Sequence, residues 1–571
     1  MVNIEMTPEA EVMRIKFYGG TREEWMKVLG GVKSLQGARF NSKDKTWIAL
    51  KTDANIEALS KLGTIKGQVG TCRAEDRKEI KKNKIFSRCP AEFREWAKAD
   101  EVVPSYDLKE RQAKMISEVE LNGTVIPGLR GYQKDFLRFM ELRGGRAILA
   151  DDMGTGKTVQ SLSWLAYSNS FPALIVVTAP TKLQWEREYH RWLAEIPDAE
   201  PVEVLKGRKS TKLYAGSSMI INWDILSDWE PILSKYGFKC IIGDEAQAIG
   251  NPNSKRGRAF LKLAKKIPQC IVMSGTPARS KPSQYWPMIS CVEPTMFPNY
   301  QAYKWRYCDP QFTPFSQYPT FDGITNAKEL HSKLMHCMLR RTKQEIMTEL
   351  PSKQIEVIPL EVDESMRGTY EQEENNIGSD KDISALRLKV SSLGRTAYLM
   401  KEKALKEWAS NMMEETGEKV IIFCWHRDVV DLLEEAFKEY NPAKIYGQTT
   451  LPEREVQKDK FINDDSCKVI IGNIQALGTG IDGLQKVCCK AIFAEFPNTA
   501  TDAMQAEDRL HRGGQENQVT IYYTCAKDTI DEDMMAALDN KRKTLDSVLD
   551  GKETDECDLL TEILARCGFI R

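Results

Sequence analysis

The sequence predicts an α/β protein with two tandem parallel-sheet lobes, a small α+β domain before them and a helical extension after them. Short apolar strands alternate with amphipathic helices from Leu129 onward, and a second series of the same kind begins near Val420. Apolar runs that alternate with helices are typical of a parallel sheet covered on both faces. The length of 571 residues also predicts several domains. Two such lobes would enclose a cleft.

The first 65 residues are predicted to form the small α+β domain. Its expected elements are a strand at 12–19, a helix at 21–35, a hairpin at 38–50 that closes on Trp47, and a second helix at 55–63. The basic stretch 66–105 is predicted to be a linker. Its most basic run, 77–88, suits either a solvated helix or a local contact with DNA.

The first lobe is predicted at 106–337, the second at 338–535, and the helical extension at 536–571. The first lobe's expected strands are 147–150, 173–180, 218–222, 240–246 and 270–275, with helices at 158–167 and 181–196. The second lobe's expected strands are 420–425, 443–447, 469–473, 491–496 and 519–524, with a helix at 429–437. Between the two series, about 294–393, the chain is predicted to be irregular and then helical.

Composition and charge limit the classes of function. The formal net charge is -1, so DNA would have to bind through local basic patches rather than a global field. The N-terminal segment has acidic residues where a signal peptide needs an apolar core, and no apolar run approaches a membrane span. We therefore expect an intracellular, soluble protein with no membrane partner. The fourteen cysteines are scattered without a CxxC spacing, so we expect buried thiols rather than a zinc site.

The segment Ala147 to Tyr167 has the pattern of a phosphate-binding loop. An apolar strand leads into Asp151-Asp152-Met153-Gly154-Thr155-Gly156-Lys157-Thr158, and helical spacing then resumes. In this context, glycines let backbone N–H groups close on phosphate oxygens, and the start of a helix adds partial positive charge. Lys157 is expected to reach the β/γ-phosphates, and the hydroxyl of Thr158 to bind Mg²⁺.

Two further strand ends carry polar groups. Asp244 and Glu245 follow the apolar run CIIG, where the carboxyl edge of a parallel sheet binds ligands. Asp244 is expected to hold Mg²⁺, and Glu245 to orient and deprotonate the attacking water. Ser274-Gly275-Thr276 ends another strand, and its hydroxyls either sense the nucleotide state or cap the next helix.

The second series ends in DAMQAEDRLHRGGQ, which contains Arg509 and Arg512. Three residues apart on a helix, the two side chains would share a face. They are expected to act as arginine fingers on the charge that develops at the γ-phosphate. The alternative is an amphipathic helix with solvated arginines, but the phosphate loop and the acid pair upstream favour the catalytic interpretation.

In this order, the segments resemble a superfamily-two helicase motor of the Swi/Snf type. The match runs from about Leu129 to Leu538. The segments that carry it are LRGYQKDFL, LADDMGTGKTVQSL, VVTAPTKLQWEREYHRW, IIGDEAQAIGNPNSKR, MSGTPARSKPSQYW, MLRRTKQEIMTELPSK, VIIFCWHRDVVDLL, IGNIQALGTGIDGLQ and QAEDRLHRGGQ. Three positions depart from the usual pattern: Asp151 replaces a glycine, Gln247 stands where His is more frequent, and Asp482 lies among apolar positions.

The resemblance implies two RecA-like lobes, an ATP-binding helicase domain followed by a helicase C-terminal domain, with ATP and Mg²⁺ as cofactors. Gln133 would contact adenine, and Asp152 to Thr158 would hold the phosphates. The implied catalytic residues are Lys157, Asp244, Glu245, Arg509 and Arg512, and the implied metal ligands are Thr158 and Asp244. By their positions in the motifs, the implied DNA contacts are Lys182, Asn222, Trp425, Thr479 and Gly480.

Two segments, SGTPARSKPSQYW and IFAEFPNTATDAMQAEDRLHR, are similar to the annealing-helicase branch, which contains the HARP (HepA-related) proteins. The hairpin GARFNSKDKTWIAL looks like part of a HARP-type domain. The sequence therefore predicts an ATP-dependent translocase that remodels or reanneals double-stranded or forked DNA, largely without sequence specificity. The alternatives are a strand-separating DNA or RNA helicase, a motor subunit of a multi-protein DNA-processing system, and a catalytically silent DNA-binding scaffold.

Overall fold

The computed structural model describes residues 107–549, apart from gaps at 200, 209–212, 276–281, 298, 312–318, 322, 378–382 and 479–480. Before residue 107 it describes 3–8, 12–18, 39–41, 46–50 and 64–66, together with Val32, Leu35, Asn55 and Ala58. Two compact units make up the chain, 1–99 with 310–320, and 100–309 with 321–571. Most of the predicted linker and of the helices at 21–35 and 55–63 lies outside the described residues, as does 550–571.

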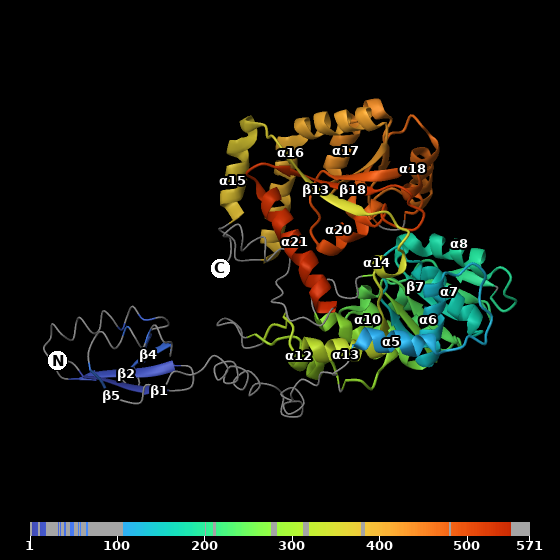
Figure 1. The fold of residues 1–571 in the computed structure, drawn as a ribbon, viewed down its shortest axis with the longest axis horizontal. Coiled ribbons are helices and arrows are strands. Elements are labelled where there is room, and N and C mark those ends of the chain that lie inside the picture. Colours follow the sequence, from blue (N-terminus) through green and yellow to red (C-terminus); the bar gives the residue numbers. More distant parts are fainter. Residues whose placement is uncertain are drawn as a thin grey trace. The chain divides into compact units, whose positions relative to one another are not determined.

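The first unit contains a mixed sheet, drawn in blue in Figure 1. Its described strands are β1 (Asn3–Pro8), β2 (Val12–Tyr18), β3 (Arg39–Asn41), β4 (Thr46–Leu50) and β5 (Thr64–Lys66), in the order β3-β4-β2-β1-β5. The predicted strand at 12–19 and the hairpin at 38–50 are confirmed, because β4 pairs antiparallel with both β2 and β3. Trp47 lies opposite Ile15 and Phe40. β1 and β5 were not predicted.

The first lobe is built on a parallel sheet with seven described strands, in the order β12-β6-β11-β10-β7-β9-β8. These are β6 (Arg146–Leu149), β7 (Ala173–Val177), β8 (Val202–Val204), β9 (Ser218–Asn222), β10 (Cys240–Gly243), β11 (Gln269–Met273) and β12 (Met338–Leu339). The five predicted strands all appear, and β8 and β12 are additional. Because β12 pairs with β6, the first lobe's sheet extends past the boundary expected after residue 337.

Helices cover both faces of this sheet (Figure 1). They are α5 (Leu108–Ser117), α6 (Gly131–Leu142), α7 (Lys157–Tyr167), α8 (Lys182–Leu193), α9 (Leu226–Leu233), α10 (Lys255–Lys266), α11 (Tyr285–Val292), α12 (Tyr300–Tyr307), α13 (Ala327–Cys337) and the short α14 (Lys343–Ile346). Leu149, Ile175 and Ile242 point to one face and pack against α6, α7 and α8.

The second lobe repeats the design with six described parallel strands in the order β13-β18-β17-β14-β16-β15. They are β13 (Lys353–Leu360), β14 (Lys419–Cys424), β15 (Ala443–Ile445), β16 (Val469–Asn473), β17 (Cys488–Phe493) and β18 (Val519–Ala526). The region expected to be irregular and then helical contains β13, which corrects that prediction. β13 is an edge strand whose side chains are mostly exposed, so it lacks the continuous apolar run of its neighbours.

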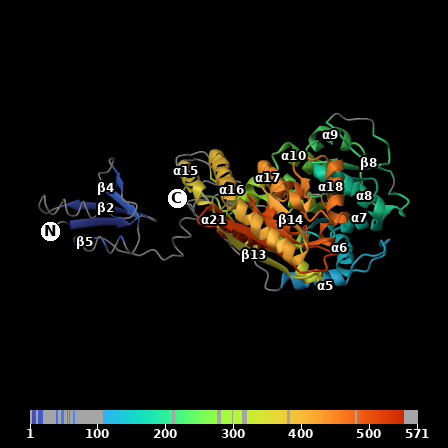
Figure 2. The same ribbon diagram turned by 90° about the horizontal axis from the view of Figure 1, so that it is seen from above.

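The helices of the second lobe also lie on both faces of its sheet (Figures 1 and 2). They are α15 (Arg367–Ile377), α16 (Ile383–Thr416), α17 (Arg427–Ala436), α18 (Leu451–Asn463), α19 (Ile474–Leu477), α20 (Ala500–Glu507) and α21 (Ile530–Leu549). Val420 and Ile422 belong to a core with α17, whereas Ile421 and Phe423 belong to a second core with α20 and α21.

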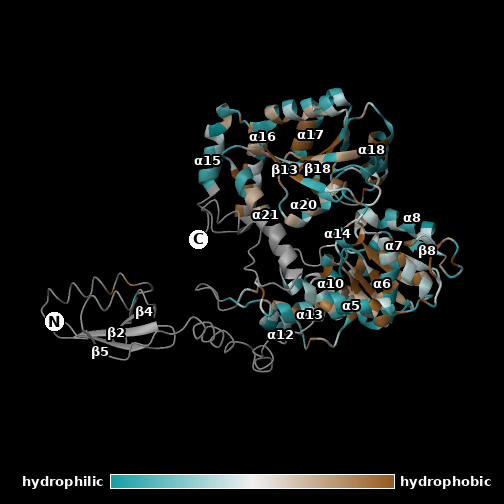
Figure 3. Ribbon diagram, viewed as in Figure 1, coloured by the Kyte–Doolittle hydropathy of each residue, from teal (hydrophilic) through white to brown (hydrophobic). Residues whose placement is uncertain are grey.

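The predicted fold class of two parallel-sheet α/β lobes is confirmed. Figure 3 shows hydrophobic strands inside each lobe and more polar helices outside. The ten cysteines in the described part of the chain are free thiols and buried, as expected. Among the described helices, none combines the length and apolar character that a membrane crossing requires.

Candidate active site

The phosphate loop joins β6 to α7 and depends on two glycines with positive φ. Gly154 has φ +80° and Gly156, the N-cap of α7, has φ +81°. A Cβ atom on Gly156 would lie 2.7 Å from Nε2 of Gln133, and one on Gly154 would lie 2.7 Å from Cβ of Arg512. Both φ values are left-handed, and the Cβ of Arg512 leaves no room for a side chain at Gly154, so both positions favour glycine. The loop therefore has the backbone freedom that a phosphate cradle requires.

Lys157 is partly buried at the start of α7. Its Nζ donates to the carbonyl oxygens of Asp151 and Asp152, at 2.8 and 2.9 Å. Burial lowers the pKa of Lys157, and the carboxylates around it, Glu245 first among them, oppose that shift. A partly buried ammonium group that is bonded to loop carbonyls suits an anionic ligand, because phosphate oxygens are stronger acceptors than carbonyls.

Asp151, the residue that departs from the usual glycine, is a fully buried structural anchor. Its Oδ1 accepts hydrogen bonds from the backbone N and Nε of Arg341, at 3.1 and 3.0 Å, and its Oδ2 accepts one from Nη2 of the same residue. The guanidinium of Arg341 also lies 5.5 Å from the ring centre of Tyr132. The departure therefore ties the loop to the segment that leads into the second lobe.

Asp244 and Glu245 follow β10, next to the phosphate loop. Nε1 of Trp185 donates to Oδ2 of Asp244, and the backbone N of Glu245 donates to Oδ1, both at 2.9 Å. Burial and the nearby Glu245 raise the pKa of Asp244 to about 6. Glu245 has φ +50°, a left-handed conformation that is strained for a non-glycine residue and is frequent at functional sites. A bound cation would stabilise the ionised form of Asp244.

Gln247 connects the acid pair to the strand end that contains Ser274. Its Nε2 donates to Oε2 of Glu245, and its Oε1 accepts from the hydroxyl of Ser274 at 2.7 Å. An amide can donate and accept at the same time, so the Gln at this position links both neighbours. Ser274 is thereby linked to Glu245 through Gln247. Thr276 lies outside the described residues.

Arg509 and Arg512 do not share a helix face, contrary to the prediction. α20 ends at Glu507, and both arginines lie in the turns that follow it. Nη1 of Arg509 donates to the carbonyl of Ile481 at 2.9 Å, whereas its buried Nε has no hydrogen-bond partner. Burial, together with Arg512, lowers the pKa of Arg509 to about 10. A partly buried guanidinium with an unbonded Nε is suited to an incoming anion.

Arg512 is held by the unusual acid in the second lobe. Its Nη1 lies 3.2 Å from Oδ1 of Asp482. Burial would raise the pKa of Asp482, but Arg512 and a backbone hydrogen bond from Gly483 lower it below the ordinary value. Asp482 therefore gives Arg512 an ionic partner within its own lobe.

These groups line one cavity of about 190 Å³ between the two lobes. Lys157, Thr158, Asp244 and Glu245 come from the first lobe, and Arg509 and Arg512 come from the second. Met153, Gly154 and Gly156 also line it. Every residue predicted to be catalytic is thus brought together.

Three of the predicted nucleotide contacts lie elsewhere. Gln133 packs behind the loop, where its Nε2 lies 3.4 Å from the carbonyl of Thr155 and its Oε1 accepts from the backbone N of Arg130. Thr155 is fully buried and bonds the carbonyl of Asp152. The side chain of Asp152 accepts from the backbone N of Lys343 at 3.0 Å. These residues support the cavity's wall and do not line it.

Of the residues predicted to contact DNA, Lys182, Asn222 and Trp425 do not line the nucleotide cavity. Nζ of Lys182 donates to the carbonyl of Leu205 at 3.1 Å, and burial together with Lys206 lowers its pKa. Asn222 is buried at the end of β9. Trp425 follows β14, and its backbone N donates to Oε2 of Glu495 at 2.7 Å. Thr479 and Gly480 lie outside the described residues.

The hydrogen bond of Trp185 to Asp244 and that of Arg341 to Asp151 were not predicted from the sequence. Trp185 occupies an apolar position of an amphipathic helix, so its spacing indicated a core residue. Arg341 lies 190 residues from its partner Asp151, and no local pattern links the two.

The donor set suits Mg²⁺. Within the described part of the chain, no group of three or more His, Cys, Asp or Glu side chains could hold a metal. Asp244 and Thr158 supply one carboxylate and one hydroxyl on the same cavity. Mg²⁺ is usually bound by one or two carboxylates, with waters and substrate phosphates as the other ligands. The cavity therefore fits Mg²⁺ together with a nucleotide phosphate.

Comparison with known families agrees with this geometry. The SNF2-related domain matches residues 132–418, just over half of the chain, and the helicase conserved C-terminal domain matches residues 400–514. The first of these domains implies that the chain binds a nucleotide.

Two curated relatives and one solved structure are similar to the chain. The DNA annealing helicase and endonuclease ZRANB3 of Homo sapiens is 29% identical over 74% of this chain and 40% of its own length. The SWI/SNF-related matrix-associated actin-dependent regulator of chromatin subfamily A-like protein 1 of Xenopus laevis is 30% identical over 77% and 46%. The chain thus spans less than half the length of these relatives. The Sulfolobus solfataricus SWI2/SNF2 ATPase core in complex with dsDNA is 24% identical over 76% of this chain and 95% of that one, with a TM-score of 0.37.

Proposed function

Because the chain belongs to the family of proteins with an SNF2-related domain, we propose that it is an ATP-driven translocase on double-stranded DNA that remodels or reanneals forks and junctions. The observation that carries the proposal is the cavity in which Lys157, Asp244 and Glu245 of the first lobe face Arg509 and Arg512 of the second. The Swi/Snf-type resemblance of the sequence is confirmed. The name of one relative, a DNA annealing helicase, supports the reannealing activity.

Each residue of the cavity has a separate role in the proposed hydrolysis. ATP supplies the phosphoanhydride bond, and Mg²⁺ neutralises phosphate charge. Lys157 would exchange its two loop carbonyls for phosphate oxygens, and Asp244 and Thr158 would hold the metal. Glu245, fixed by Gln247, orients the attacking water and accepts its proton.

The second lobe completes the site. The Nε of Arg509 has no partner and can donate to the phosphate. Arg512 would leave its ion pair with Asp482 and bind the negative charge that develops on the phosphate. Because these arginines and the phosphate loop belong to different lobes, hydrolysis and release change how the lobes are held together. A DNA backbone bound across both lobes would convert that change into steps. Lys182, Asn222, Trp425, Thr479 and Gly480 are the proposed contacts, and binding through phosphates would be strongly salt-dependent.

The test is steady-state ATPase activity with no nucleic acid, single-stranded DNA, duplex DNA, forked DNA and RNA, with Glu245→Gln as the inactive control. We expect strong stimulation by duplex or forked DNA and none in the variant. Labelled fork substrates then distinguish the modes, because a duplex translocase reanneals strands or leaves them paired.

Three other outcomes correspond to the alternatives. Stimulation only by single strands or RNA, with strand release, would favour a strand-separating helicase. Stimulation that needs a second protein would favour a motor subunit of a DNA-processing system. DNA binding without hydrolysis under any condition would indicate a silent scaffold and would refute the proposed mechanism.

A further inference from the structure

The segment between β12 and α14 bonds to the phosphate loop through two arginines. Nη1 of Arg340 donates to the carbonyl of Ala150 at 2.9 Å, and its Nη2 lies 3.4 Å from Oδ1 of Asp152. Arg341 holds Asp151, as described above. The segment is thereby fixed against the first lobe just before the chain enters the second.

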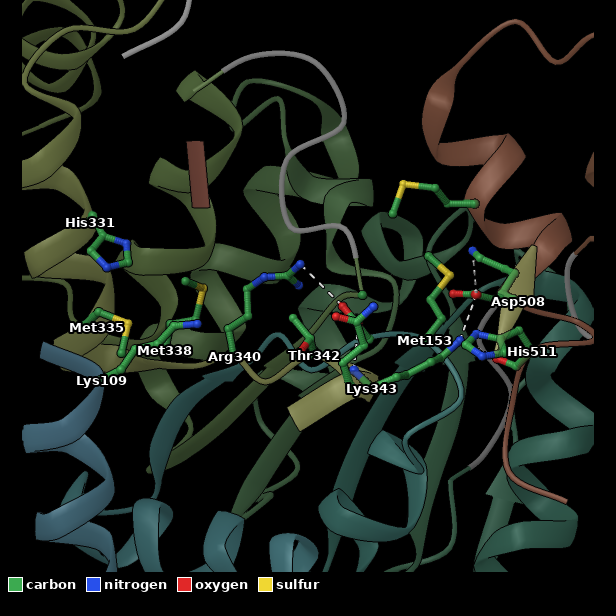
Figure 4. Close-up of a pocket in the computed structure, with 15 residues that line it drawn as sticks. Lys109, Met153, His331, Met335, Met338, Arg340, Thr342, Lys343, Asp508 and His511 are labelled. Atoms are coloured by element: carbon green, nitrogen blue, oxygen red, sulfur yellow. Dashed lines mark hydrogen bonds and ion pairs between the residues drawn. The ribbon is translucent and has the colours of Figure 1, made fainter. Parts of the chain in front are cut away.

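Lys343 extends this connection into the second lobe. Its backbone N donates to Oδ2 of Asp152 at 3.0 Å, while its Nζ lies 2.7 Å from Oδ1 of Asp508 and also donates to the carbonyl of His511. Figure 4 shows the side chain reaching Asp508 and His511 along the wall of a cavity. Asp508 and His511 immediately precede Arg509 and Arg512 in the sequence. One ammonium group therefore contacts the residue before each arginine finger.

The environment of Lys343 indicates that this contact is specific. Lys343 is 5% exposed. Burial lowers its pKa, and Asp508 opposes that shift. Burial would also raise the pKa of Asp508, but Lys343 and Lys353 hold it below the ordinary value. A buried charge is tolerated only when it is paired and hydrogen-bonded, so Lys343 and Asp508 depend on each other.

We propose that Lys343 is a positioning residue for hydrolysis, which sets the distance between the phosphate loop, through Asp152, and the turns that carry Arg509 and Arg512. This inference rests on the proposed ATPase function. The side chain does not line the 190 Å³ nucleotide cavity, so it acts through the two arginines and not on the nucleotide. Fixing the spacing in advance reduces the reorganisation needed when the arginines engage the phosphate.

Lys109 provides a matched control. It lines the same cavity of about 440 Å³ as Lys343, which Figure 4 shows. Its Nζ lies 3.2 Å from Oε1 of Glu345, and both side chains are nearly half exposed. Removing this cation changes the charge of the cavity and leaves the contacts of Lys343 intact.

The experiment compares the full chain with Lys343→Met, Lys109→Met, Asp508→Asn and the double variant Lys343→Met/Asp508→Asn. The measurements are kcat and KM for ATP with duplex DNA, Kd for a fluorescent ADP, and the thermal midpoint. We expect Lys343→Met to lower kcat at least about tenfold, since small misplacements of catalytic groups cost up to about 10²-fold. The ADP Kd should stay within about twofold, and Lys109→Met should match the wild type. The double variant should be no slower than the slower single variant, because both remove one link.

The inference is overturned if Lys343→Met keeps kcat within about twofold of an active wild type, or if the two single effects multiply in the double variant. A fall in kcat with equal losses of ADP binding and thermal midpoint would show a purely structural residue and would also overturn it. If Lys343→Met does not fold, Asp508→Asn tests the same link from the second lobe. A wild type without ATPase activity would instead refute the proposed function itself.

Discussion

Asp244→Asn should stabilise the ligand-free protein while it abolishes hydrolysis. The folded protein raises the pKa of Asp244 to about 6 from an ordinary value of 3.8, because the carboxyl is buried beside Glu245. Folding therefore disfavours the ionised form that predominates at neutral pH. Asn keeps the shape and carries no charge, and its single amide oxygen can still accept the hydrogen bond from Trp185, although it loses the one from the backbone N of Glu245.

The magnitude follows from the pKa difference. A carboxyl whose folded pKa lies about two units above its unfolded pKa costs roughly 3 kcal/mol at pH 7.5, and contact with water in the cavity reduces this. We expect Asp244→Asn to raise the free energy of unfolding by about 1–3 kcal/mol at that pH. Because a carboxyl with a raised folded pKa destabilises the folded state only while it is ionised, the penalty in the wild type disappears as the pH falls. The advantage of Asp244→Asn should therefore fall to about half near pH 5 and become small near pH 4, as the wild-type carboxyl becomes protonated.

The assay is urea unfolding at pH 7.5, 5 and 4 without nucleotide or metal, with ATPase activity measured in parallel. Lys109→Met, which removes an exposed charge that does not line the nucleotide cavity, is the control. A variant that is less stable than the wild type at pH 7.5, or whose advantage does not shrink toward pH 4, would refute the reasoning. It would mean that the ionised carboxylate of Asp244 does not destabilise the folded protein when no cation is bound.

Other features of the site and the fold give three further predictions. Gly156→Ala should cost about 1–2 kcal/mol in unfolding free energy, since its φ of +81° is left-handed, and should weaken ADP binding; unchanged melting and binding would contradict the close contact with Gln133. Asp482→Asn should raise the DNA-independent ATPase rate severalfold by releasing Arg512, and a lower rate would show that Asp482 assists hydrolysis. Deletion of residues 1–65, which the sequence predicts to form a HARP-like domain, should leave ATPase activity on duplex DNA intact but reduce fork remodelling; equal remodelling would refute a role for this domain in remodelling.

The sequence predicted what depends on local pattern. Continuous apolar runs identified the central strands, because both faces of a parallel sheet are buried. The phosphate loop was also predicted, because Gly154, Gly156 and Lys157 lie within one short segment. β13 was missed because an edge strand exposes alternate residues, and the arginine turn was mistaken for a helix because apolar spacing continues past Glu507.

Pairing across long separations could not be predicted. The contact of Asp151 with Arg341 and that of Lys343 with Asp508 join residues that no local periodicity relates. The local sequence around these residues does not indicate which partner each charge has. Only the fold shows that the linking segment bonds to both halves of the site.

The contact between Asp151 and Arg341 has a consequence for biosynthesis. The ribosome completes the phosphate loop long before it makes β12 and Arg341, so the nascent first lobe contains a carboxylate in its interior without its counter-ion. Until about residue 343 has emerged, the loop can fold only at the cost of burying that charge. The nucleotide site of the first lobe should therefore mature late in translation, and a fragment that stops at residue 337 should bind nucleotide more weakly than one that continues to Ile346.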